Sequence, residues 1–288
     1  MTVGDASPRT RENRVPSADG AIGGIVVALV IASASTLTPG TVFADDQTAV
    51  SSCAGQTTLP VTFQIDCSDV KDAGAKQLCK PFIENQACKV FPAYRQITGI
   101  NLEETCPSIN YTIYDKDNWP GGGEAGGLTL KCAVQYLAEY SLNTKAPPNL
   151  GPYDTHELLH VYQAVLGAIP YAQILFGPSQ AEAMRLIGDV EAYDRAVKQM
   201  TDTTANFEER FQRLSNRPGL EKCVLAEIQV EETLYLDNPK TVYAFYRKLV
   251  RSRVADLADR QARFNRMYNT VSGGKSRQFL IAHGCAPF

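Results

Sequence analysis

The segment Thr155-His-Glu-Leu-Leu-His-Val-Tyr-Gln-Ala-Val-Leu-Gly167 places two of the three histidines of the 288-residue chain four positions apart. Apolar residues cover most of its circumference, so the pattern predicts a largely buried helix over Thr155–Gly167. At about 100° per residue, His156 and His160 lie on one face of such a helix. A buried polar group needs a partner, because without one it destabilises the fold. A metal ion bound by both imidazoles supplies that partner.

Glu157 lies on the flank of the same face, where a carboxylate can hydrogen-bond a metal-bound water without binding the metal. Zinc lowers the pKa of its water towards 7, and the carboxylate accepts a proton as the water attacks a carbonyl group. The order His-Glu-x-x-His therefore predicts one Zn²⁺ per chain, held by His156 and His160, with Glu157 as general base. Two histidines that only pack in a core are the alternative interpretation.

The His156-Glu157-x-x-His160 motif resembles that of the zincin metallopeptidases, and the resemblance covers Asp154–Arg195. The metzincin branch continues with Gly and a third His, whereas this chain has Gln163 and Leu166 at those positions. In the gluzincin and aspzincin branches, the third ligand is a Glu or Asp on a later helix. The resemblance thus implies a zinc peptidase of gluzincin-like or aspzincin-like type, with the subfamily unassigned.

That later helix is predicted over Ser179–Met200. Within it, Glu191-Ala-Tyr193 resembles the acidic-x-Tyr signature of fungal deuterolysin-like aspzincins, with Glu in place of Asp. The Gly-Thr-x-Asp form of the deuterolysin motif is absent from the chain. Tyr193 is also a candidate hydrogen-bond donor to the oxyanion of the tetrahedral intermediate, and packing in the core is its alternative role.

The helical period also favours Glu191 as the third ligand. Met184, Ile187 and Val190 mark the predicted buried side of the helix over Ser179–Met200, and Glu191 borders that side. The other candidates, which stay open, are Asp189, Glu182, Asp194 (also expected as a neighbour that supports Glu191) and His283.

The N-terminus has the features of a secretory signal peptide over residues 1–44. Three arginines precede the apolar, uncharged run Ala21–Ser35, which is shorter than the about 20 residues of a membrane-spanning helix. Val42-Phe-Ala44 then offers a cleavage site. We expect a secreted, extracellular protein with no stable membrane span after cleavage; an uncleaved anchor is the alternative.

All eight cysteines follow residue 44, and an even number in an exported chain predicts four disulfides. The sequence does not determine their pairing. No two cysteines have the C-x-x-C spacing, which argues against a cysteine metal site. The cysteines are Cys53, Cys67, Cys79, Cys88, Cys106, Cys132, Cys223 and Cys285.

The expected architecture is α+β and mainly helical: a small sheet, a cysteine-rich N-terminal lobe over residues 45–127, and a helical zincin-like region over 128–288. Asn110–Tyr114 alternates as a strand does, and we expect it at a sheet edge that aligns an extended peptide. The remaining helices are predicted over Leu128–Leu142, Ala205–Leu214, Leu220–Leu236 and residues 239–271.

A net charge of −3 gives no electrostatic basis for binding nucleic acid or a membrane surface. We expect a secreted zinc metallopeptidase, specifically a metalloendopeptidase, whose partners are peptide or protein substrates. The alternatives are a zinc hydrolase that processes one dedicated partner and a non-enzymatic binding protein on a zincin scaffold. Glu157 favours an enzyme, because a degenerate scaffold often loses its base.

Overall fold

The computed structural model describes residues 47–54, 58–121, 126–142, 155–165, 175–213, 219–251 and 269–285. All of them lie in one compact unit, Ser35–Phe288. This part of the chain is mainly helical with a small mixed sheet, which confirms the α+β class. The predicted signal peptide of residues 1–44 lies outside the described residues.

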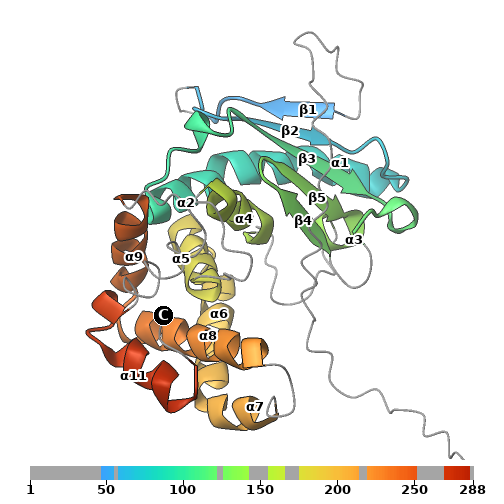
Figure 1. Ribbon diagram of the computed structural model, residues 1–288. Coiled ribbons are helices and arrows are strands. Elements are labelled where there is room, and N and C mark those ends of the chain that lie inside the picture. Colours follow the sequence, from blue (N-terminus) through green and yellow to red (C-terminus); the bar gives the residue numbers. More distant parts are fainter. Residues whose placement is uncertain are drawn as a thin grey trace, which may run out of the picture. The chain divides into compact units, whose positions relative to one another are not determined.

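The sheet has five strands in the order β1-β2-β3-β5-β4. The three inner strands β2, β3 and β5 are parallel, and β1 and β4 are antiparallel edges (Figure 1). Alternation along β3 buries one face of the strand, as expected for a strand packed on a core. The strands are β1 (Gln47–Val50), β2 (Thr62–Asp66), β3 (Ser108–Tyr114), β4 (Gly127–Leu130) and β5 (Ala133–Leu137).

The predicted strand over Asn110–Tyr114 is confirmed, but its predicted place at an edge is wrong. It belongs to β3, which has β2 on one side and β5 on the other. A central strand has no open backbone groups for a peptide, because both neighbours already use them. Of the strands near the histidines, β4 is the one at an edge.

The predicted helix over Leu128–Leu142 is also wrong. The segment forms the hairpin of β4 and β5, followed by the short helix α3 (Ala138–Ser141). Lys131 makes the reversal possible, since its φ of 55° lies in the left-handed region. Val134 and Tyr136, two positions apart on β5, are both buried, as expected for a strand with one face on the core. The many apolar residues of the segment concealed this period of two.

Helices α1 (Ala73–Asn85) and α2 (Phe91–Thr98), joined by a wide π-helical turn over Gln86–Val90, bring a buried aromatic group against the sheet. The Tyr94 hydroxyl donates to the Thr155 carbonyl at 2.6 Å, and the Tyr162 hydroxyl donates to the Phe91 carbonyl at 3.2 Å. These two bonds fix α4 (His156–Val165) against α2, so the core determines where the paired histidines lie.

The later helices gather on the side of α4 that faces away from β1 (Figure 1). The helix predicted over Leu220–Leu236 is confirmed as α8. The helices predicted over Thr155–Gly167 and residues 239–271 begin within one residue of the predicted positions, as α4 and α9. Single-turn helices also occur at Leu102–Glu104 and Lys116–Asn118. The later helices are α5 (Phe176–Ile187), α6 (Val190–Ala205), α7 (Phe207–Arg213), α8 (Gly219–Asp237), α9 (Lys240–Arg251) and α11 (Lys275–Ala282).

The predicted single helix over Ser179–Met200 is wrong, because the chain breaks it into α5 and α6. Gly188 ends α5 with a φ of 85°, a conformation that suits glycine, and Asp189 then caps α6 through its side chain. The apolar period read across the break, from Met184 to Val190, therefore does not describe one helix face. Val190 is exposed.

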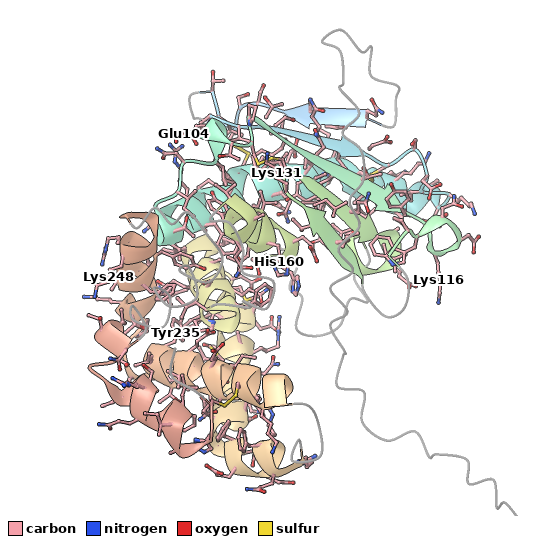
Figure 2. The ribbon with its side chains drawn as sticks, in the orientation of Figure 1. Glu104, Lys116, Lys131, His160, Tyr235 and Lys248 are labelled. Atoms are coloured by element: carbon pink, nitrogen blue, oxygen red, sulfur yellow. A yellow bond between two sulfur atoms is a disulfide. The ribbon has the colours of Figure 1, made fainter. Side chains whose placement is uncertain are left out.

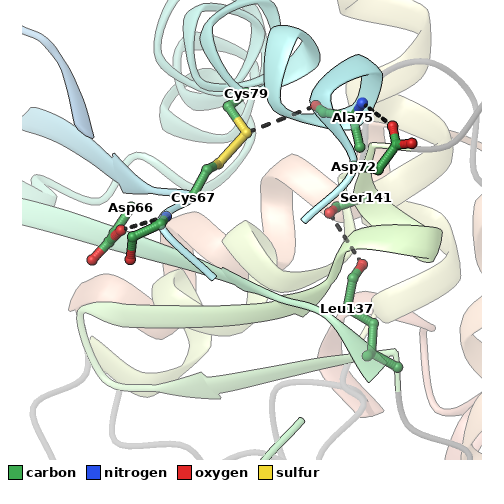
Figure 3. Close-up of a disulfide and its surroundings, with 8 residues drawn as sticks. Asp66, Cys67, Asp72, Ala75, Cys79, Leu137 and Ser141 are labelled. Carbon is green, nitrogen blue, oxygen red and sulfur yellow. Dashed lines mark hydrogen bonds between the residues drawn. A yellow bond between two sulfur atoms is a disulfide. The ribbon is translucent and has the colours of Figure 1, made fainter. Parts of the chain in front are cut away.

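All eight cysteines are paired, which confirms the prediction of four disulfides. Cys67–Cys79 joins the end of β2 to α1, whose first turn is capped by Asp72 (Figure 3). The pairs are Cys53–Cys88, Cys67–Cys79, Cys106–Cys132 and Cys223–Cys285. Among the described residues, no helix combines the length and apolar character that crossing a bilayer requires.

Candidate functional site

Helix α4 carries the His-Glu-x-x-His motif and is anchored on its other sides by buried side chains. Leu158, Leu159, Val161 and Tyr162 are almost completely buried, as the sequence predicted. The helix contacts β4 and β5 on one side and α2 and α5 on others. The motif is therefore held between the sheet edge and the helical region (His160 is labelled in Figure 2).

The two imidazoles lie on one face of α4, with ring centroids 5.0 Å apart. His160 Nδ1 lies 2.9 Å from Gln163 Oε1. Because that oxygen only accepts, Nδ1 carries the proton and Nε2 keeps its lone pair for a metal. Burial lowers the pKa of His160, and burial together with His160 lowers the pKa of His156 to about 3. Both rings are thus neutral at neutral pH, the form that binds metals.

Glu157 is buried beside the imidazoles, with 5% of its surface exposed, and Oε1 lies 3.8 Å from His156 Nε2. The Thr129 hydroxyl donates to Glu157 Oε2 at 2.5 Å, and the Glu157 backbone N–H donates to the Tyr136 hydroxyl at 3.3 Å. Burial raises the pKa of Glu157 to about 7, although the Thr129 hydrogen bond acts in the opposite direction. The carboxylate is therefore both desolvated and fixed in orientation.

Two residues of β4 that the sequence analysis missed shape this carboxylate site. Thr129 supplies the hydroxyl, and Gly127 supplies empty space, because a Cβ there would overlap the Glu157 carboxylate. No local pattern marks either residue. The wrong helix assignment over Leu128–Leu142 also hid the alternation that places Gly127 and Thr129 on one face of a strand.

Phe176 at the start of α5 is a third residue that the sequence did not reveal. Its ring centroid lies 4.4 Å from that of His156 and 5.0 Å from that of His160. It meets His156 edge-on and stacks on His160. The histidine pair is thus packed against an aromatic ring from another helix.

The structure does not bring Glu191 together with the two histidines. Its side chain is 87% exposed and pairs with Arg195 at 2.7 Å on α6. Among the described residues, no three His, Cys, Asp or Glu side chains are grouped closely enough to hold a metal ion. The assignment of Glu191 as third ligand therefore stays a prediction.

The alternative ligands Asp189, Asp194 and His283 differ in their burial and in their hydrogen-bond partners. Asp189 accepts the Ala192 N–H at 3.0 Å through one oxygen, while its other oxygen is buried and has no hydrogen-bond partner in the described part of the chain. Asp194 is exposed on α6. His283 lies 3.1 Å from Glu208 in a separate aromatic cluster near the Cys223–Cys285 disulfide.

Glu182 is unsuited to binding a metal, because its oxygens are already occupied. Only 1% of its side chain is exposed, and Arg185 forms a two-pronged ion pair with it at 2.6 and 3.0 Å. The hydroxyls of Tyr235 and Tyr243 donate to the same carboxylate at 3.3 and 2.5 Å (Tyr235 is labelled in Figure 2). Tyr193 borders this network, because burial, Glu182 and then Tyr193 raise the pKa of the Tyr235 hydroxyl.

The side chains at this site fit two of the protein ligands that a zinc ion needs, both of them imidazoles. Two neutral imidazoles share one face, the orientation of one is fixed by Gln163, and a buried carboxylate lies on their flank. Nitrogen donors of this kind suit zinc. Comparison of the chain with protein-family models, curated proteins and solved structures gives no match.

Proposed function

We propose that the protein is a secreted zinc metallopeptidase of zincin type, acting as a metalloendopeptidase on peptide or protein substrates. His156 and His160 are its zinc ligands, Glu191 is the expected third ligand, and Glu157 is the general base. The observation that carries the proposal is the position of Glu157, buried on the flank of two neutral imidazoles and oriented by Thr129. The four disulfides are compatible with an extracellular location.

The residues divide the chemistry between them. Zinc, when bound, supplies a Lewis acid at the two imidazoles. Glu157 accepts a proton from the water that attacks the peptide carbonyl and can return it to the leaving amine. Thr129 keeps the carboxylate in one orientation, and the Leu158, Leu159 and Val161 side chains of α4 help to exclude water from the far side of the helix.

The edge strand β4 supports a peptide rather than a small molecule as substrate. Among the described strands, β4 pairs with β5 alone, so its other side presents backbone groups. An extended peptide can add to such an edge through main-chain hydrogen bonds. Because β4 also contacts α4 and carries Thr129, a peptide on this edge would pass next to Glu157.

The exposed position of Glu191 favours a second candidate, a non-enzymatic binding protein on the same scaffold. An ion pair with Arg195 at 2.7 Å occupies the side chain that the peptidase needs as a ligand. Such a protein would lack zinc or bind it weakly, and it would recognise its partner without hydrolysing it.

The deciding experiment combines metal analysis with peptide digestion for the wild type, Glu157→Gln and Glu84→Gln. We expect one zinc per chain in all three, and loss of hydrolysis in Glu157→Gln alone, on the order of 10²- to 10⁴-fold. Glu84 is an exposed carboxylate on α1 and serves as the matched control. Wild-type protein that carries no zinc, or Glu157→Gln that digests peptides at the wild-type rate, would contradict the proposal.

A further inference from the structure

The turn that precedes α5 contains a strained residue. Leu175 is not a glycine, yet its φ of 52° and ψ of 29° place it in the left-handed region, and it is 3% exposed. Such a conformation costs on the order of 1 kcal/mol for a residue with a Cβ, so it persists only where surrounding contacts enforce it. Its carbonyl accepts the Ser179 N–H at 2.7 Å, which begins the hydrogen-bond pattern of α5.

A buried carboxyl group from a distant part of the chain contacts this turn. The Leu175 backbone N–H donates to Glu231 Oε2 at 2.8 Å, and Glu231 is 3% exposed on α8. The carboxyl oxygen accepts the Leu175 N–H at the start of α5, where backbone N–H groups have no partner inside the helix, so the contact satisfies both buried groups. Glu231 thus fixes the backbone at the point where α5 begins.

The residue that follows Leu175 is Phe176, whose ring packs on both imidazoles at 4.4 and 5.0 Å. The backbone angles of Leu175 set the direction in which α5 presents Phe176. His160 is therefore held between Gln163 on one side and the Phe176 ring on the other, and His156 meets the edge of the same ring. Contacts run without interruption from Glu231 to the histidine pair.

We propose that Glu231 is a positioning residue that holds both imidazoles in their metal-binding orientation through Leu175 and Phe176. The proposal rests on the proposed function in one respect, namely that the imidazoles bind zinc. Residues that orient metal ligands from outside typically contribute 10- to 100-fold to metal affinity. Glu231 acts on the rings and contributes no ligand, so it is distinct from the candidate third ligands.

The test compares Glu231→Leu, Glu231→Gln and Phe176→Leu in the full chain by two measurements. In metal-free protein, NMR of the imidazole protons reports the ring current of Phe176 on His156 and His160. In a competition assay with a chelator, the zinc dissociation constant reports how well the ligands are oriented. Glu232→Gln is the matched control, since Glu232 is the next residue on α8 and accepts a hydrogen bond from Thr203.

We expect Glu231→Leu to move the imidazole signals towards those of Phe176→Leu and to weaken zinc binding about 10-fold. Glu231→Gln keeps an oxygen that accepts the Leu175 N–H and should restore both readouts to near wild type. Glu232→Gln should change neither. If Glu231→Leu does not fold, Glu231→Asp replaces it, because a side chain one methylene shorter retains the carboxyl group but draws it back from the Leu175 N–H.

The outcomes separate the two proposals. A folded Glu231→Leu or Glu231→Asp with wild-type imidazole signals and zinc affinity overturns the positioning role of Glu231. Wild-type protein without zinc contradicts the proposed function. In that case, imidazole signals of metal-free Glu231→Leu that differ from those of the wild type still support the contact through Leu175 and Phe176. Loss of zinc in the Glu232→Gln control as well would show a general effect of α8 and would also overturn the proposal.

Discussion

The Thr129 hydroxyl lies 2.5 Å from Glu157 Oε2 and 3.1 Å from the Glu157 backbone carbonyl, so one side chain of β4 contacts both the carboxylate and the main chain of α4. Gly127, two residues earlier on the same strand, leaves the space that the carboxylate fills. The sheet edge and the histidine helix are therefore fitted to each other at the residue proposed as general base. A change in β4 is expected to alter the proposed chemistry without changing a proposed zinc ligand.

Thr129→Val tests this fit. The substitution keeps the shape of the side chain and removes the hydroxyl, so Glu157 loses its orienting hydrogen bond. We expect kcat/KM for peptide hydrolysis to fall about 10-fold, which corresponds to about 1.4 kcal/mol, with zinc content unchanged. Steady-state kinetics with metal analysis measure both quantities. Full activity in Thr129→Val would show that the hydroxyl has no part in orienting the base.

Glu191→Ala and Asp189→Ala separate the two leading candidates for the third ligand. We expect Glu191→Ala to weaken zinc binding, because a catalytic site with three protein ligands loses one of them. Asp189→Ala should instead lower stability by about 1 kcal/mol, since it removes the N-cap of α6, and leave zinc in place. Chelator competition and thermal unfolding report the two effects. The reverse pattern would assign the ligand to Asp189, whose second oxygen is buried without a partner in the described residues.

The Glu182 network predicts an effect on stability that is independent of zinc. Tyr243→Phe removes a hydroxyl that donates to a buried carboxylate, so the free energy of unfolding should fall by about 1–2 kcal/mol. Tyr114→Phe on β3 is the control and should have a smaller effect. Denaturant unfolding measures both variants. An unchanged stability in Tyr243→Phe would mean that Arg185 and Tyr235 are sufficient to compensate the charge of Glu182.

Glu227 on α8 gives a pH dependence that does not involve the candidate site. Burial raises the pKa of its carboxyl group from 4.5 to about 7 in the folded protein. Folding favours the protonated form of Glu227. Its contribution to the free energy of unfolding is therefore complete below pH 4.5 and is lost as the pH rises through about 7. We expect this loss to amount to roughly 2 kcal/mol by pH 8, after allowance for partial exposure.

Glu227→Gln should remove that loss. Denaturant unfolding at several pH values between 5 and 8 measures this. The free energy of unfolding of the variant should increase relative to that of the wild type as the pH rises. Glu209→Gln, which changes an exposed carboxylate on α7 paired with Arg213, should keep the wild-type slope. Parallel curves for wild type and Glu227→Gln would contradict the raised pKa.

The features that the sequence predicted correctly depend on short spacings within one element. The common face of His156 and His160 follows from helix geometry alone, and the burial of α4 follows from its composition. The strand over Asn110–Tyr114 is likewise visible in its alternation. The break between α5 and α6 was missed, although Gly188 followed by Asp189 combines a typical helix end with a typical helix cap and could have predicted it.

The missed features arise from contacts between segments far apart in the chain. Thr129 reaches Glu157 from 28 positions away, and Glu231 reaches Leu175 from 56 positions away. Local propensity contains no information about such pairs. The disulfide pairing was inaccessible for the same reason, although the number of disulfides followed from the even number of cysteines.

The Cys106–Cys132 disulfide has a consequence for when the proposed activity could arise. Cys106 lies just before β3, and Cys132 lies in the turn between β4 and β5, so the bond ties the hairpin that carries Thr129 to the rest of the sheet. In a reducing cytosol this bond does not form. We expect newly made chains to keep a loosened β4 and an unoriented Glu157 until they reach an oxidising compartment. If the protein is the secreted peptidase proposed above, the reducing cytosol would keep it inactive inside the cell that makes it.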